Sequence, residues 1–168
     1  MRKRICVGLV VAMAVLGVWR LAASGTPGES ILRGAQRVEV FRVGSKPVKD
    51  GSEKSIGDFP ILATGKEQGA DFARRLSRVL LSSGVTANRK KCGLEPGVAY
   101  RLWNGDRAVE VLVCFKCDVL WPHVMGSQFA KPHHEWQDFD RARPELLALT
   151  KEAFPQDAEI QQLPDRRD

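Results

Sequence analysis

The stretch GVAYRLWNGDRAVEVLVCFKC, residues 97–117, decides the fold of this 168-residue chain. Two runs rich in β-branched and aromatic residues flank Asn104-Gly105, a dipeptide typical of a β-hairpin because both central positions of a type I′ turn need φ > 0. With Asn104 and Gly105 as a two-residue loop, Trp103 faces Asp106. The stretch therefore predicts an antiparallel hairpin at the centre of a small sheet.

Three cysteines gather at the open end of this hairpin, namely Cys92, Cys114 and Cys117. Counting outward from the turn brings Cys92 close to Cys117. The fourth cysteine, Cys6, lies in an amino-terminal segment that is predicted below to be a signal peptide. The remaining three, an odd number in an oxidising compartment, predict one structural disulfide, from Cys92 to Cys114 or to Cys117, with the third thiol buried. A bond between Cys92 and Cys117 closes a loop of about 25 residues, which the chain-entropy model equates with about 3.5 kcal/mol of stability.

A zinc site is an alternative use of the same cysteines. Cys114 and Cys117 have the two-residue spacing of a zinc knuckle, and Cys92 supplies a third thiolate from the adjacent strand. The histidines available as a fourth ligand are His123, His133 and His134. The second Cys-x-x-Cys pair that usually accompanies such a site is missing from the sequence.

Thiol redox chemistry is the other alternative at this pair. A reactive Cys-x-x-Cys usually lies at a helix N-terminus, where the dipole lowers the thiol pKa. Here the pair ends a predicted strand and is followed by Asp118, whose charge raises that pKa. The sequence contains neither a Gly-x-Ser-x-Gly nucleophile elbow nor a His-Glu-x-x-His helix, so it assigns no catalytic residue.

The amino terminus has the pattern of an export signal. The basic residues of 2–4 precede an uncharged apolar run, Ile5 to Trp19, and small residues follow at 22–24. As a helix this run spans about 22 Å, less than the roughly 30 Å hydrocarbon core of a membrane. Residues 1–24 are therefore predicted to be a signal peptide, or a short anchor that contacts the membrane only through residues 5–19 if uncleaved. The predicted location is extracytoplasmic, in the periplasm or cell envelope.

Removal of this segment changes the charge of the protein. The formal net charge of +6 includes four cations within residues 1–24 and no acid there, so the remaining chain carries +2. A charge this small gives no reason to expect a nucleic-acid partner. The expected partner is an unidentified molecule of the envelope, and no cofactor other than the alternative zinc is expected.

The rest of the chain predicts one α+β domain over residues 36–163. Residues 25–35 lack any period and are expected to be a flexible tether, and residues 164–168 a frayed tail. The segment Arg37 to Val43 alternates as a half-buried strand does. Two principal helices are expected on one face of the sheet, the first over 65–83 and the second over 141–153. The first is expected to begin with a capping box at Thr64-Gly65-Lys66-Glu67.

Three tryptophans follow or belong to the hairpin, namely Trp103, Trp121 and Trp136. Aromatic side chains in such a position either cover the small sheet as core or line a binding surface. The sequence thus favours a non-enzymatic binding or structural module stabilised by its cysteines, and a zinc-binding or thiol-redox protein is the alternative.

Two groups of motifs resemble those of a group of small exported bacterial proteins of unknown function. The first group runs from Lys90-Lys91-Cys92 through the Pro96–Trp103 segment to Cys114-Phe115-Lys116-Cys117, and the second from Phe139-Asp140 through Arg143-Pro144 to Phe154-Pro155. The resemblance covers roughly residues 55–163. It implies that the three cysteines form one unit with the C-terminal helix, and it implies no activity.

Overall fold

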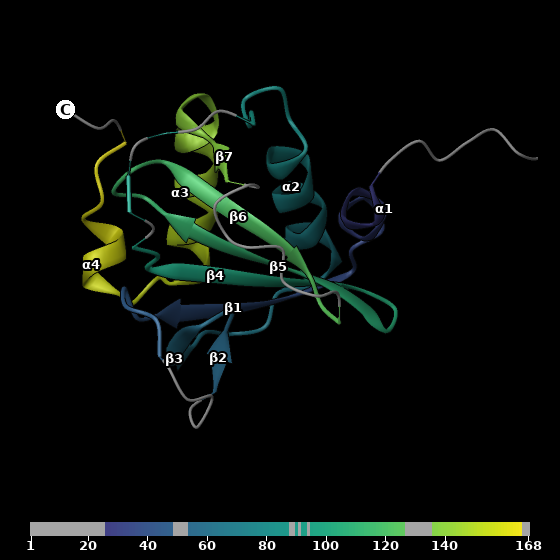
Figure 1. The fold of residues 1–168 in the computed structure, drawn as a ribbon, viewed down its shortest axis with the longest axis horizontal. Helices are drawn as coiled ribbons and strands as arrows, with labels where there is room; N and C mark the ends of the chain where they lie inside the picture. The colour runs from purple at the N-terminus through teal and green to yellow at the C-terminus, as the bar shows by residue number, and fades with distance from the viewer. Residues whose placement is uncertain are drawn as a thin grey trace, which may run out of the picture.

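The computed structural model describes residues 26–48, 54–87, 90, 92–93, 95–126 and 136–165. These residues form an antiparallel seven-stranded sheet with the strand order β2-β3-β1-β4-β5-β6-β7. Figure 1 shows that the sheet is curled, with helices behind it. The strands are β1 (Arg37–Val43), β2 (Ser55–Ile56), β3 (Phe59–Thr64), β4 (Val98–Asn104), β5 (Arg107–Cys114), β6 (Val119–Val124) and β7 (Gln137–Asp138). The predicted α+β class is confirmed.

The helices provide most of the side chains that cover one face of the sheet. They are α1 (Pro27–Arg33), α2 (Ala70–Leu80), α3 (Arg143–Ala153), preceded by a 3-10 turn η1 (Asp140–Ala142), and α4 (Ala158–Gln161). Alternate residues of the strands, such as Val40 of β1 and Val111 of β5, point into this core. Tyr100 of β4 is fully buried there, and its hydroxyl lies 2.6 Å from the Thr150 hydroxyl of α3. Among the described residues, no helix has the length and apolar character needed to cross a membrane.

The hairpin lies where the sequence predicts it, but its turn is one residue further along. Asn104 pairs with Arg107, so the two-residue loop is Gly105-Asp106, and Trp103 faces Ala108 rather than Asp106. Gly105 has φ of 61°, which is the first loop position of a type II′ turn. Asn104 stays in the strand, where its side-chain amide donates to the Ser30 carbonyl at 3.4 Å.

The predicted tether contains a helix. Thr26 caps α1 by accepting a hydrogen bond from the Glu29 N–H at 3.3 Å, and a proline at the start of the helix favours its initiation. Ile31 and Leu32 are buried in the main core. The prediction was wrong because two buried residues in a seven-residue helix make no detectable period. The predicted signal segment, 1–24, lies outside the described residues.

The predicted first helix begins five residues later than expected. Thr64 is the last residue of β3, and α2 starts at Ala70 with Gly69 as its N-cap. The intervening backbone continues to pair with β1: Gln68 and Val38 exchange two hydrogen bonds, at 2.8 and 2.9 Å. Because these backbone groups are used by the sheet, the predicted capping box does not form. The second helix, α3, is confirmed within two residues of its predicted start.

Candidate functional site

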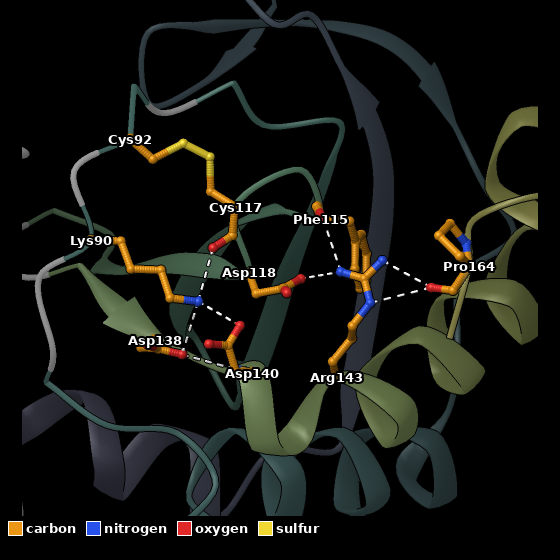
Figure 2. A network of polar contacts seen from close by, with 9 residues as sticks. All are labelled: Lys90, Cys92, Phe115, Cys117, Asp118, Asp138, Asp140, Arg143 and Pro164. Carbon is orange, nitrogen blue, oxygen red and sulfur yellow. Dashed lines mark hydrogen bonds and ion pairs between the residues drawn. A yellow bond between two sulfur atoms is a disulfide. The ribbon is translucent and has the colours of Figure 1, made fainter. Parts of the chain in front are cut away.

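The predicted neighbourhood of the three cysteines is confirmed. Cys92 and Cys117 are joined as a disulfide, with their Cα atoms 6.3 Å apart, as Figure 2 shows. Cys114, the last residue of β5, has a free and fully buried thiol. Its side chain belongs to one apolar cluster with Cys117 and Val119, against which Cys92 packs. Of the two pairings that the sequence left open, the structure therefore contains the one with Cys117.

A lysine and two aspartates connect this disulfide to the start of α3. The Lys90 ammonium donates to the Cys117 carbonyl at 3.0 Å and to the Asp140 carboxylate at 2.5 Å. It also lies 3.2 Å from the Asp138 carboxylate, which accepts the Asp140 backbone N–H at 2.8 Å. Lys90 thus joins the backbone beside the disulfide to the segment that leads into η1 (Figure 2).

A buried arginine completes the connection. The Arg143 guanidinium forms an ion pair with Asp118, and each of these side chains is less than 5% exposed. It also donates to the Phe115 carbonyl at 2.9 Å and, through two nitrogens, to the Pro164 carbonyl at 3.2 and 2.9 Å. The carbonyl of Pro164, the first residue of the predicted frayed tail, is therefore hydrogen-bonded to α3, and residues 166–168 lie outside the described residues.

Asp118 occupies an unusual backbone conformation in the turn between β5 and β6. Its φ is 53°, in the left-handed region that aspartate tolerates better than most side chains. Burial raises the pKa of the Asp118 carboxyl above its ordinary value, the nearby Asp140 raises it further, and Arg143 opposes both. The charge of Asp118 is thus costly to bury and depends on Arg143 for compensation.

Seven of the nine residues drawn in Figure 2 form what we call the cysteine clasp. Its members come from three separate parts of the chain and are Lys90, Cys92, Cys117, Asp118, Asp138, Asp140 and Arg143. Each charged member contacts another member or a backbone carbonyl. The arrangement holds the turn after β5 against the N-terminal end of α3. Sequence reasoning missed the roles of Asp138 and Arg143, because these partners are distant in sequence.

The other face of the sheet carries side chains in rows that cross the strands. We call it the helix-free face, because α1, α2 and α3 pack on the opposite side (Figure 1). The strand register defines three adjacent rows. The apolar row consists of Phe41, Ala99, Leu112 and Trp121. The charged row beside it consists of Glu39, Arg101, Glu110 and His123. The outer row consists of Arg37, Trp103 and Ala108 and is extended by Met125.

The charged row is tied together by hydrogen bonds across β1, β4 and β5. Arg101 donates to Glu110 at 2.9 and 2.7 Å and to Glu39 at 3.2 Å. Glu39 also accepts the Trp103 indole N–H at 3.0 Å. Partial burial raises the pKa of Glu39, but the hydrogen bonds from Trp103 and Arg101 outweigh it, so this pKa lies below its ordinary value. Glu39 is therefore held in its charged form, which fixes the Trp103 indole.

The outer row is the part of this face that offers aromatic and flexible apolar surface. The Arg37 guanidinium lies 4.7 Å from the centre of the Trp103 ring, within the range of a cation–π contact. Met125, whose N–H donates to the Ala108 carbonyl, is 40% exposed and one of two large apolar side chains with that much exposure among the described residues.

The three tryptophans, for which the sequence left both a core and a surface role open, all lie on the helix-free face but differ in burial. Trp103 is half-buried in the outer row. Trp121 is only 4% exposed and belongs to a second small core with Phe41 and Phe59, against which Trp136 packs. Trp121 is therefore a core residue, and Trp103 is the tryptophan that best fits the interpretation as surface.

Of the predicted ligands of the alternative zinc site, the three cysteines lie together, but His123 does not join them. His123 lies opposite Glu110, whereas Cys114 lies opposite Val119, and four residues of strand separate these positions by about 13 Å. Among the described residues, no group of three or more His, Cys, Asp or Glu side chains is placed to hold a metal ion. His133 and His134 lie outside the described residues.

No family model, curated protein or solved structure matches the chain.

Proposed function

We propose that the protein is a non-enzymatic binding module of the cell envelope, in which the cysteine clasp is scaffold and the helix-free face contacts a protein partner. Export of the chain by residues 1–24 is part of this proposal, on the basis of the basic start and the short apolar run. The observation that carries the proposal is the composition of the outer row, in which Arg37 lies beside Trp103 and Met125 follows on the far side of Ala108.

Arginine, tryptophan and methionine are enriched at protein–protein interfaces relative to other surfaces. Trp103 offers a large rigid surface whose orientation is already fixed by Glu39 and Arg37, so little conformational entropy is lost on binding. Met125 offers a polarizable side chain that adapts to a partner. The neighbouring charged row supplies a polar rim with paired charges, which limits the desolvation cost of contact.

The clasp supports the scaffold half of the proposal. Its ionic groups are turned toward one another, and its central ion pair, Arg143 with Asp118, is almost completely shielded from solvent. A group that acts on a substrate must reach it, and burial of this degree favours a structural role.

Site-specific photocrosslinking tests the proposed surface. A photoreactive phenylalanine analogue placed at Trp103 in the full-length protein is expected to give one discrete adduct, recovered from the envelope fraction of cells that make the protein. The matched control is the same analogue at Arg78, which is exposed on α2 and so lies on the helix side of the sheet. Equal adducts at both positions, or no adduct at Trp103 in a folded protein, would refute the proposed surface.

A further inference from the structure

We propose that the free thiol of Cys114 exchanges with the Cys92–Cys117 disulfide, which gives the protein a second covalent form. In that form Cys114 is bonded to Cys117, and Cys92 is a thiol at the surface. The proposed binding function leaves Cys114 without a role, and this inference does not depend on that function.

Proximity and burial restrict the chemistry open to Cys114. Its side chain is fully buried in the apolar cluster that contains Cys117 and against which Cys92 packs. An external reagent or partner cannot reach a sulfur atom with no exposed surface. The disulfide in its own cluster is therefore the reaction partner that the fold provides. Cys114 and Cys117 are also only three positions apart, with Cys114 at the end of β5 and Cys117 in the turn to β6.

The exchange is balanced without any added oxidant or reductant. During a local opening of the turn that admits water, the Cys114 thiol loses its proton to that water, and the resulting thiolate attacks Sγ of Cys117. The bond between Sγ of Cys114 and Sγ of Cys117 forms as the bond between Cys117 and Cys92 breaks. The electron pair leaves on the Cys92 sulfur, which then takes up a proton. Among Cys92, Cys114 and Cys117, one disulfide and one thiol are present before and after the reaction.

Solvent exposure selects Cys92 as the leaving group. Cys92 is half-buried, whereas Cys117 is only 4% exposed. Water stabilises the negative charge that develops on a sulfur leaving at Cys92, whereas the same charge at Cys117 would develop in an apolar environment. Because a better-solvated sulfur is the better leaving group, attack at Cys117 is favoured over attack at Cys92. The product presents an accessible thiol that can react with a disulfide-bearing molecule.

Alkylation of the full-length oxidised protein tests this proposal. The native protein is incubated with N-ethylmaleimide at about pH 8.5 without reductant, and disulfides and labels are located by tryptic peptide mapping. Cleavage after Lys116 separates Cys114 from Cys117, so each pairing gives a distinct pair of peptides. We expect the label to accumulate on Cys92 together with an equal amount of the Cys114–Cys117 disulfide. In the Cys114→Ala variant, labelling of Cys92 should fall at least tenfold.

Three results would overturn the proposal. The first is a wild-type protein in which Cys92 stays unlabelled over days. The second is a label on Cys114 with the Cys92–Cys117 bond intact, which would show opening of the core without exchange. The third is a label on Cys117 with a Cys92–Cys114 disulfide, which would show the opposite leaving group. Since the wild-type map alone distinguishes these results, the test does not depend on the stability of the variant.

Discussion

Replacement of Arg143 by methionine is expected to lower the free energy of unfolding by about 3–5 kcal/mol, the usual cost of removing one partner from a buried ion pair. Arg143 compensates the buried carboxylate of Asp118 and donates to the carbonyls of Phe115 and Pro164. Methionine preserves much of the apolar volume of the arginine side chain. The measured decrease in the free energy of unfolding therefore reports the removal of the positive charge and of the hydrogen-bond donors. Urea denaturation followed by circular dichroism measures it.

Two further variants test whether the loss of stability is specific to the ion pair or would follow from any substitution in this segment. Arg141→Met removes the same charge two residues earlier, at an exposed position, and should change the free energy of unfolding by no more than about 0.5 kcal/mol. Asp118→Asn removes the buried charge, so combining it with Arg143→Met should cost less than the sum of the two single variants. If Arg143→Met and Arg141→Met are equally stable, the clasp does not stabilise the fold.

Removal of the disulfide is expected to cost about 3.5 kcal/mol, because the loop that it closes spans 25 residues. The variant is Cys92→Ala with Cys117→Ala, which prevents a substitute bond to Cys114. The matched control, Cys114→Ala, leaves the loop closed and should lose less stability in the same urea titration without reductant. The photocrosslink from Trp103 should survive in the double variant at a temperature where it remains folded.

The opposite result would show that the cysteines act in binding and not in the scaffold. In that case the double variant would unfold at the same urea concentration as Cys114→Ala and would lose the Trp103 adduct. The disulfide would then matter for binding without contributing to stability.

The features that follow from local sequence were predicted well. Asn104-Gly105 located the hairpin because a positive φ is needed there, and Gly105 provides it. The periodic apolar positions of α3 located that helix, since its buried residues recur at helical spacing. The proximity of the cysteines followed from the hairpin alone, because an antiparallel fold brings the two ends of the segment together.

The features that depend on tertiary pairing were not predicted. Arg143 and Asp118 are 25 positions apart, and Lys90 and Asp140 are 50 apart, so no local pattern indicates that either pair meets. The rows of the helix-free face depend on the exact register, which the predicted turn placed incorrectly. The capping box at Thr64 satisfied a local rule, but backbone pairing of the following residues with β1 prevented it.

Cys92 and Cys117 form a disulfide in the structure, and we propose that this bond is part of the scaffold and that these cysteines ligate no metal. The most direct test combines peptide mapping with metal analysis of protein purified without chelator or reductant and alkylated at about pH 6, where thiol exchange is slow. The expected result is a Cys92–Cys117 disulfide, a Cys114 thiol that reacts only after denaturation, and no stoichiometric metal. One zinc ion per chain, with all three cysteines alkylated once the zinc is removed, would contradict the claim.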